Sequence, residues 1–322
     1  MKRTKTPASP TKIVAAAGAG VCALALAGCS IGPVNLSFLD KYVTSTTVSE
    51  AKAQRQEDHA NAVEASELLE AGTLTIGYKS TDTAPLVVSN SDGTVTGIDI
   101  ELGYAVAEQM GLKAKFVSVS DTSAIGTKCD VLVGCTSSDA GSYVVLGDYA
   151  EDAVTVFGKN VSGTISSSDL AGKTVAVQAG SASQRLVTKL GLDVTQTNFT
   201  SLNDAFSALD SGSVDYVVCG AYSGGYLAAV YDNIGVAATL ETPTAIGVAV
   251  DTSKATLTTA LSSAVEKVQT GGQLDVIKSR WVGGMQTLTT ASQLMDLANL
   301  NAVANAGLED GAESSQSESA TD

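Results

Sequence analysis

The sequence predicts an α/β fold in which parallel β-sheets are covered by helices on both faces. Short apolar runs of strand length alternate along the chain with longer runs that have helical periodicity. The strand-like runs are apolar at nearly every position, which is typical of strands that are buried on both faces. Together these observations favour parallel sheets over an all-α or all-β protein.

Residues 1–28 have the pattern of a secretory signal. Four basic residues open the segment, and an apolar run over 13–25 follows that is too short to span a membrane. The segment ends in Leu-Ala-Gly directly before Cys29, which resembles the lipobox of bacterial lipoproteins. That resemblance implies cleavage before Cys29 and a diacylglycerol on its sulfur, and two acyl chains anchor a protein well. We therefore expect lipidation of Cys29 and anchoring to the outer face of the bacterial cell membrane. A plain cleaved signal with a coincidental cysteine is the alternative.

The net charge of −15 argues against one class of partner. Removing the four basic residues of the signal leaves −19 for the rest of the chain. A strongly acidic surface disfavours nucleic acids and anionic lipid headgroups, which both need clustered Lys and Arg. No second apolar run is long enough to span a bilayer, so the membrane contact that we expect is the lipid alone.

Three cysteines follow the predicted lipidation site, namely Cys129, Cys135 and Cys219. No CxxC occurs and the single histidine, His59, is distant in sequence, so we expect no metal site. Cys129 and Cys135 lie on one predicted strand, about 20 Å apart at ~3.3 Å per residue, which is too far for a disulfide. Cys135 and Cys219 end two predicted strands. Thiols, a disulfide between them or thiol-based ligation are all compatible with the sequence.

The flanking segments have simpler patterns. Residues 29–71 combine a Ser- and Thr-rich tether with a helical run over 48–69. The apolar stripe of that run is mostly alanine, so we expect a spacer or a loosely docked arm. Residues 286–308 are predicted to form a helical extension. The acidic tail 309–322 is predicted to be disordered, because it carries too little apolar surface to offset its chain entropy.

Between the flanks, the best-defined helix has Ile98, Leu102, Val106 and Met110 four residues apart, with Gly111 as its cap. The remaining runs are helical over 201–212 and 257–272, and strand-like over 74–78, 113–119, 130–134, 174–178, 215–219 and 245–250.

Three stretches of this alternating region resemble one protein family. They lie within 72–117, 169–218 and 261–284, and the last contains Gly-x-Leu-x-x-Ile-x-x-x-Trp-x-Gly from Gly272 to Gly283. In this order they resemble the family 3 extracellular solute-binding proteins of bacterial amino-acid ABC transporters.

The resemblance implies a type II periplasmic-binding-protein fold, with two parallel-sheet lobes joined by two hinge strands. Lobe one would comprise 72–157 and 248–285, and lobe two 158–247, with crossings near 154–158 and 246–250. The resemblance further implies a monomer without cofactor or catalytic residues, which holds a small polar solute between its lobes. An ABC permease and its ATPase would then take up the solute.

The predicted solute site lies at the carboxyl ends of the strands, where open α/β sheets bind ligands. A helix begins directly after the strand at 174–178, and the N–H groups at such a start suit a carboxylate. The resemblance assigns the ligand carboxylate to this position, and an ordinary strand-to-helix turn is the alternative. The predicted ligand-binding residues are Tyr78, Lys79, Asp82, Thr136, Ser137, Gln178, Gly180, Ser181, Ala182, Ser183, Gly220 and Tyr222.

Two positions depart from the family pattern. Ser142 stands where the family has an arginine for the amino-acid carboxylate, and Gly220 where it has an aspartate for the ammonium. Each lost charge-assisted contact would weaken binding by roughly 1.5–3 kcal/mol, so we expect ordinary free α-amino acids to bind weakly. Lys79 partly compensates if it reaches an anionic group, and an exposed lysine on the lobe rim is the alternative.

Three further side chains have more than one interpretation. Asp82 can hold a cationic group or make a local turn hydrogen bond. Tyr222 can offer its ring to the solute or fill the core. Asp99 comes just before the helical run at Ile100, so we interpret it first as a helix cap.

These features favour a lipid-anchored solute receptor that works by hinge closure and breaks no bond. One alternative is a surface receptor or sensor lipoprotein without a transport role. Another is a dehydratase-type enzyme on the same fold. General acid–base catalysis needs a positioned His, Glu, Asp or Lys, and the only histidine lies in the predicted spacer. We therefore expect no enzymatic activity.

Overall fold

The structure is a computed structural model that describes residues 63–79, 84–139 and 141–305. These residues all belong to one compact unit, 48–322. The predictions for the signal, Cys29, the tether, most of the spacer helix, Asp82 and the acidic tail lie outside the described residues.

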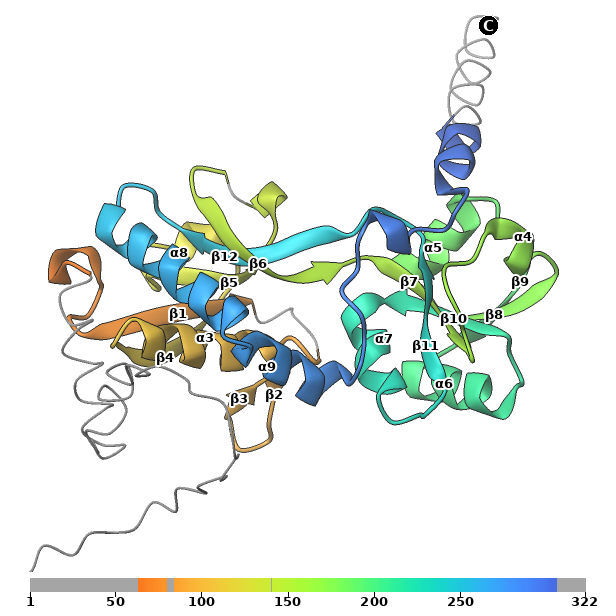
Figure 1. Ribbon diagram of the computed structural model, residues 1–322, viewed down its shortest axis with the longest axis horizontal. Helices are drawn as coiled ribbons and strands as arrows, with labels where there is room; N and C mark the ends of the chain where they lie inside the picture. The colour runs from red at the N-terminus through yellow and green to blue at the C-terminus, as the bar shows by residue number, and fades with distance from the viewer. Residues whose placement is uncertain (1–62, 80–83, 140, 306–322) are drawn as a thin grey trace, which may run out of the picture. The chain divides into compact units, whose positions relative to one another are not determined.

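The first sheet has five strands in the order β4-β1-β5-β12-β6 (Figure 1). Helices α3, α8 and α9 contact one another, and α3 and α8 also pack on strands of this sheet. The small hairpin of β2 and β3 precedes α3. The elements are β1 (Thr73–Lys79), β2 (Val88–Ser89), β3 (Val95–Thr96), α3 (Ile98–Gln109), β4 (Lys113–Val119), β5 (Val131–Cys135), β6 (Val144–Asp152), β12 (Thr244–Val250), α8 (Ala255–Thr270) and α9 (Gln273–Val282).

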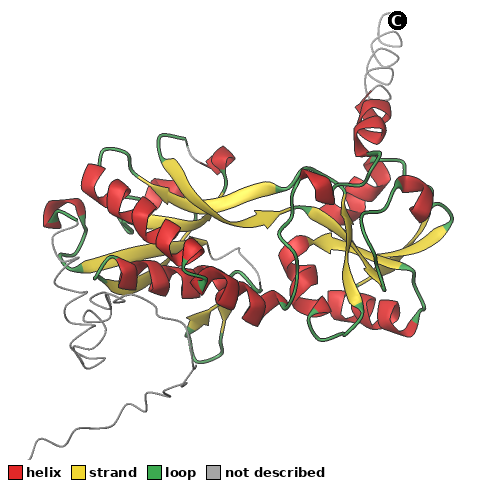
Figure 2. Ribbon diagram, in the orientation of Figure 1, coloured by secondary structure: helices red, strands yellow, loops and turns green. Residues whose placement is uncertain are grey.

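The second sheet also has five strands, in the order β11-β7-β10-β8-β9. Helices alternate with its strands along the chain (Figure 2). The elements are β7 (Val154–Lys159), α4 (Ser167–Leu170), β8 (Lys173–Gln178), α5 (Ala182–Lys189), β9 (Val194–Phe199), α6 (Leu202–Ser211), β10 (Tyr216–Gly220), α7 (Ala221–Ala228) and β11 (Ile234–Thr239). Short 3-10 turns are η1 (Ala65–Glu67), η2 (Thr122–Ala124), η3 (Ser137–Asp139) and η4 (Thr290–Ser292).

The predicted α/β fold class is confirmed, and all six predicted strands form within one or two residues of their expected bounds. Strand β1 pairs in parallel with β4 and β5, and β8 pairs in parallel with β9 and β10. The sheets are mixed, however, because β12 and β7 pair antiparallel with their neighbours. Both strands adjoin the points where the chain changes sheet.

The chain changes sheet slightly before the positions predicted from the sequence. It passes from β6 to β7 at Ala153 and from β11 to β12 over residues 240–243. Residues 154–158 therefore belong entirely to the second sheet. Residues 246–250 belong entirely to the first. The crossings that the family resemblance implies, near 154–158 and 246–250, therefore fall inside strands that each belong to a single sheet.

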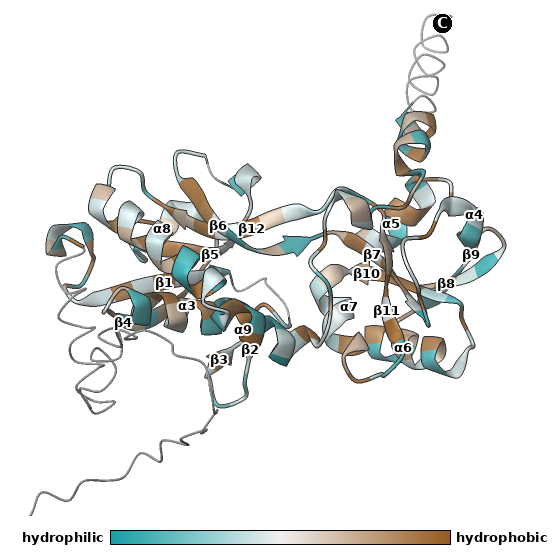
Figure 3. Ribbon diagram, in the orientation of Figure 1, coloured by the Kyte–Doolittle hydropathy of each residue, from teal (hydrophilic) through white to brown (hydrophobic). Residues whose placement is uncertain are grey.

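Hydrophobic residues, brown in Figure 3, occur along the strands and helices of both sheets, and the buried ones form the core. The largest cluster covers the first sheet and includes the predicted helix stripe of Ile98, Leu102, Val106 and Met110. Two further clusters cover the second sheet. None of the described helices is long and apolar enough to cross a membrane.

The segment before β1 is held more firmly than a loosely docked arm. Its described part contains only the 3-10 turn η1, so the predicted α-helix does not extend over residues 63–69. The Glu67 carboxylate accepts hydrogen bonds from the Leu257 amide and the Thr256 hydroxyl, each at 2.8 Å. Glu67 thus caps the first turn of α8, and the same hydrogen bonds lower the pKa of its carboxyl despite some opposing desolvation.

The C-terminal segment after α9 returns to the second sheet, which makes a third connection between the sheets. Figure 1 shows it in dark blue beside β11. The Leu294 amide donates to the Thr239 carbonyl at 2.9 Å, and the Asp296 carboxylate accepts from the Ser167 amide at 2.9 Å. Within the described part of the predicted 286–308 helix, only η4 and residues 297–305 are helical.

Candidate functional site

Lys79 and Asp139 form an ion pair where two neighbouring strands end. Lys79 is the last residue of β1, and Asp139 closes the 3-10 turn that follows β5. The Lys79 Nζ atom lies 3.3 Å from the Asp139 Oδ2 atom, and the two side chains are 18% and 36% exposed. Since β1 and β5 are parallel, their carboxyl ends meet at the same edge of the sheet.

Thr136 completes this cluster. Its amide and its hydroxyl donate to Asp139 Oδ2 at 2.9 and 3.1 Å. Its hydroxyl also lies 2.7 Å from that of Ser138. Burial disfavours the charged form of Asp139, but the Thr136 amide and then Lys79 favour it, and the pKa of this carboxyl falls below its ordinary value. Of the predicted residues, Lys79 and Thr136 therefore lie together, and Ser137 is exposed beside them.

The second sheet presents the start of α5 at its own carboxyl edge. Ser181 is the N-cap of the helix, and its hydroxyl accepts from the Gln184 amide at 3.1 Å. The Gly180 amide donates to Gln184 Oε1 at 2.7 Å, so a side chain of the helix already occupies it. The amides of Ala182 and Ser183 come next, and N–H groups in the first turn have no partner within their own helix.

Other predicted residues of this edge have local partners. Gln178 Nε2 donates to the Thr200 carbonyl at 3.3 Å. The Ser183 side chain is buried, and Ala182 is exposed. In the first sheet, Tyr78 is half-buried and packs against the main apolar cluster.

Helix α7, which follows β10, contacts two segments of the chain outside the second sheet. The Ser223 hydroxyl donates to the Ala84 carbonyl, after β1, at 3.4 Å, and the Ala221 amide donates to the carbonyl of Ala153, between β6 and β7, at 3.0 Å. Gly220 is half-buried, and a Cβ atom added there would meet nothing within 4 Å. The position that lacks the family aspartate therefore has free space around it. Ser142, which replaces the family arginine, is exposed.

Tyr222 fills the core, which is the second of its two interpretations. Its side chain is 3% exposed and belongs to the same apolar cluster as Tyr149 and Ala153. Lys278 Nζ lies 5.9 Å from the centre of its ring. Burial, and then the nearby Glu151 carboxylate, raise the pKa of Tyr222. A ring packed in this way offers no open face to a solute.

Asp99 is a buried structural acceptor and does not cap the helix. The N-cap of α3 is Gly97, and Asp99 lies inside the first turn with no exposed surface. The Tyr149 hydroxyl donates to Asp99 Oδ1 at 2.8 Å and accepts from the Gly134 amide at 2.8 Å. Burial and the Asp99 charge raise the pKa of Tyr149. This chain of hydrogen bonds holds Gly134 near the end of β5, directly before the turn that carries Thr136.

The cysteines of the described chain are buried thiols, with no disulfide among them. Burial raises the pKa of Cys219, and burial followed by the neighbouring Asp130 raises that of Cys129 to about 11. Cys129 precedes β5 instead of sharing its strand with Cys135. Side chains that could hold a metal do not gather in groups of three or more within the described ranges.

Sequence reasoning missed Asp139, the acidic member of the first cluster. The signal for it was Thr136-Ser137-Ser138-Asp139, which has the spacing of a capping box directly after a strand. That pattern predicts a carboxylate folded back onto the strand end.

Comparison with known proteins agrees with this architecture. Residues 74–139 match the model of the bacterial extracellular solute-binding proteins, family 3. No curated protein matches the chain. A polar amino acid ABC uptake transporter substrate-binding protein from Streptococcus thermophilus has TM-score 0.59 and 19% identity, covering 74% of this chain and 92% of its own.

Two further solved structures have the same fold. The L-cystine solute receptor of Neisseria gonorrhoeae, in its unliganded open conformation, has TM-score 0.57 and 17% identity, covering 73% of this chain and 99% of its own. The second substrate binding domain of a putative amino acid ABC transporter from Streptococcus pneumoniae has TM-score 0.53 and 22% identity, covering 65% and 99%. At these identities the likeness establishes the fold. The family-model match over residues 74–139 and the type II periplasmic-binding-protein fold both make the chain similar to the bacterial extracellular solute-binding proteins, family 3.

Proposed function

We propose that this protein captures a small polar solute of the amino-acid or amino-acid-derivative class between its two sheets. The observation that carries the proposal is the Lys79–Asp139 pair at 3.3 Å, at the strand ends where α/β sheets bind ligands. A solute with both a positive and a negative group can replace one internal ion pair with two contacts of its own.

The proposed contacts come from both sheets. The anionic group lies between Lys79 and the amides of Ala182 and Ser183 at the start of α5, where backbone N–H groups and the helix dipole favour negative charge. The cationic group lies at Asp139. These residues would supply the charges that Ser142 and Gly220 lack, from different positions in the chain.

Binding favours the closed arrangement of the sheets. The solute can contact Lys79 and α5 together only when the two carboxyl edges approach each other, so its binding energy drives closure. The Ser223–Ala84 contact at 3.4 Å supports this geometry, since it joins the segment after β1 to α7, the helix that follows β10. No step in this mechanism makes or breaks a bond. In this proposal each lobe is built around one sheet, and the chain crosses between the lobes at Ala153 and over residues 240–243.

The delivery partners and the location complete the proposal. A chain anchored outside the cell membrane through Cys29 would pass its solute to an ABC permease and ATPase as a monomer. A surface sensor without a transport role would use the same site. A transport assay distinguishes the two functions, because only an importer would make uptake of the solute by the permease depend on this protein.

A thermal-shift screen with matched compounds tests the binding site. Each free amino acid is compared with its N-acetyl form, which lacks the cation, and its amide, which lacks the anion. We expect a compound with both charges to raise the melting temperature most, since ligand at 100 times Kd adds about 2.7 kcal/mol. An equal shift with all three forms would contradict the proposed charge pairing.

A further inference from the structure

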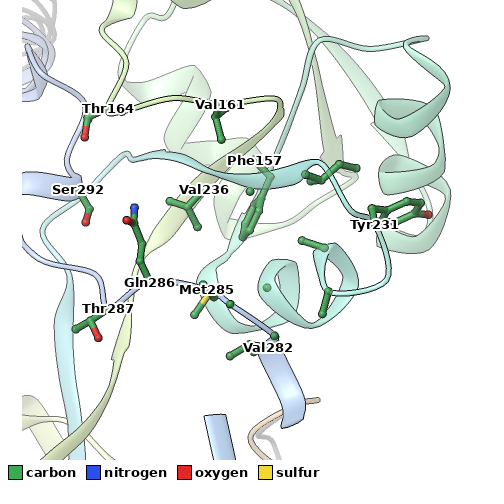
Figure 4. Close-up of a pocket in the computed structure, with 18 of the residues that line it drawn as sticks. Phe157, Val161, Thr164, Tyr231, Val236, Val282, Met285, Gln286, Thr287 and Ser292 are labelled. Carbon is green, nitrogen blue, oxygen red and sulfur yellow. The ribbon is translucent and has the colours of Figure 1, made fainter. Parts of the chain in front are cut away.

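A cavity of about 680 Å³ lies on the second sheet, away from the strand-end residues of the proposed solute site. One wall comes from β7, β11 and α7, and the other from the segment 282–292 that leads out of α9 (Figure 4). Pockets for small ligands typically enclose ~300–1,000 Å³. This cavity is therefore large enough for a second ligand.

The wall on the sheet is mostly apolar, with Thr164 and Asp232 as exceptions, and the wall on the C-terminal segment is more polar, with Val282 and Met285 as exceptions. Phe157, Val161 and Val236 line the first wall, and Gln286, Thr287 and Ser292 line the second. Figure 4 shows side chains from both walls around the same space. This division suits a molecule with an apolar ring and a polar end.

The charge of the lining residues determines which charge the polar group of a ligand can carry. Among the residues that line the cavity, Asp232 alone carries a formal charge, and it is negative. The whole chain carries −15. A neutral or singly positive ligand fits this lining, whereas a carboxylate or phosphate would meet repulsion without a basic partner.

The cavity walls are held in place by interactions of their own. The Thr164 hydroxyl donates to the Ala291 carbonyl at 3.0 Å across the cavity rim. The Met295 amide donates to the Ile165 carbonyl at 3.0 Å. Leu294 and Leu297 are 2% and 4% exposed in the core of the second sheet. The polar wall is therefore anchored on the sheet instead of lying loosely against it.

We propose that this cavity is a second binding site, which takes a neutral or monocationic amphiphile with an aromatic ring. The ligand joins the C-terminal segment to the second sheet and so strengthens the third connection between the sheets. The proposal is independent of the solute site, because the two share no residue.

Three naphthalene probes with different charges test the proposal by isothermal titration of the full chain. They are 1-naphthylmethylamine, 1-naphthalenemethanol and 1-naphthoate. We expect saturable one-to-one binding of the amine and the alcohol, and at least threefold weaker binding of the acid. Absence of saturable binding for all three, or tightest binding of the acid, would overturn the proposal.

Two variants locate the binding. Gln286→Trp fills the cavity from an exposed position and is expected to weaken amine binding at least tenfold. Val276→Trp is the control, because Val276 is 72% exposed on α9 and does not line the cavity. If Gln286→Trp does not fold, Val161→Trp replaces it, because it fills the cavity from the other wall. It is likewise expected to weaken amine binding at least tenfold. Unchanged amine binding in a folded cavity-filling variant contradicts the assignment, and Lys79→Ala is expected to leave amine binding unchanged.

Discussion

The Lys79 ammonium lies 3.3 Å from the Asp139 carboxylate, so one ion pair joins the ends of β1 and β5. Both side chains retain some exposure, at 18% and 36%, and the pair lies at the edge where strand ends meet. An ion pair that is buried completely gives a solute nothing to contact, and one that is fully exposed is weakened by water. This pair lies between those limits.

Replacing Lys79 tests the cationic part of the site. Lys79→Ala is expected to weaken binding of an anionic or zwitterionic solute about ten- to a hundredfold, the effect of losing one charged hydrogen bond. Isothermal titration measures the change. Lys115→Ala is the control, because Lys115, near the start of β4, forms an exposed ion pair with Glu70, which precedes β1, away from the carboxyl edge. An equal effect of both substitutions would mean that Lys79 acts only through the overall charge.

Acid titration tests the environment of Asp139. Its folded-state pKa is depressed, so its stabilising contribution is present above the unfolded pKa of ~3.9 and is lost as the pH falls through the folded pKa. Because the side chain is partly exposed, we expect less than about 1 kcal/mol. Chemical unfolding between pH 2.5 and 6 should show a smaller loss of stability in Asp139→Asn. Identical pH profiles would show that the carboxylate has no favourable partners in the folded protein.

Gly147 in β6 is predicted to tolerate no side chain. Its φ is +64°, and an added Cβ would lie 2.2 Å from Cγ1 of Val265 on α8. Gly147→Ala should lower the free energy of unfolding by about 2–5 kcal/mol, through backbone strain and overpacking. Gly172→Ala shares the positive φ, +71°, without any atom within 4 Å, and should lower it by only about 1–2 kcal/mol. Equal losses of unfolding free energy in the two variants would show that the positive φ alone causes the effect, and that the contact with Val265 adds nothing.

Adjacent residues test whether the C-terminal segment packs on the second sheet. Leu294 is 2% exposed and Met295 is 69% exposed. Leu294→Ala should reduce the free energy of unfolding by about 2–4 kcal/mol, and Met295→Ala by no more than about 0.5 kcal/mol. Urea unfolding of both variants measures the difference. Small and equal effects would show that the segment does not dock.

Thiol labelling tests the state of the three described cysteines. In a chain with Cys22 and Cys29 replaced by serine, Ellman's reagent should detect three thiols in denaturant and react slowly in the native protein. Slow reaction follows from burial, which raises the pKa of Cys129 to about 11. Detection of only one thiol in denaturant would indicate a disulfide.

The strands were predictable because their signal is local. The run 113–119 contains Phe116, Val117 and Val119, which are residue types that favour strands, and it forms β4 with the predicted bounds. The positions of Lys79 and Thr136 followed from the rule that ligands bind at strand ends. Asp139 was missed because the pairing of its turn with β1 depends on a neighbour 60 residues away.

Two features depend on tertiary contacts that the pattern does not encode. Tyr222 lies two residues after the end of β10, a position from which a side chain can reach a solute. Helix α7 begins directly after that strand, however, and Tyr222 on its first turn packs in the apolar core. The return of the C-terminal segment depends on Leu294 and Leu297, which are buried in the core of the second sheet, whereas the nearby Met295 and Val303 are exposed.

The most direct test of the account measures solute affinity in one variant of each sheet. Ala182→Pro removes an N–H group at the first position of α5, where proline is tolerated and the preceding Ser181 is already extended, with ψ 161°. Isothermal titration with the best zwitterionic solute of the thermal-shift screen should show at least tenfold weaker binding in both Ala182→Pro and Lys79→Ala, with melting temperatures of the unliganded proteins nearly unchanged. Full affinity in either folded variant would contradict the claim that one solute is held by both sheets.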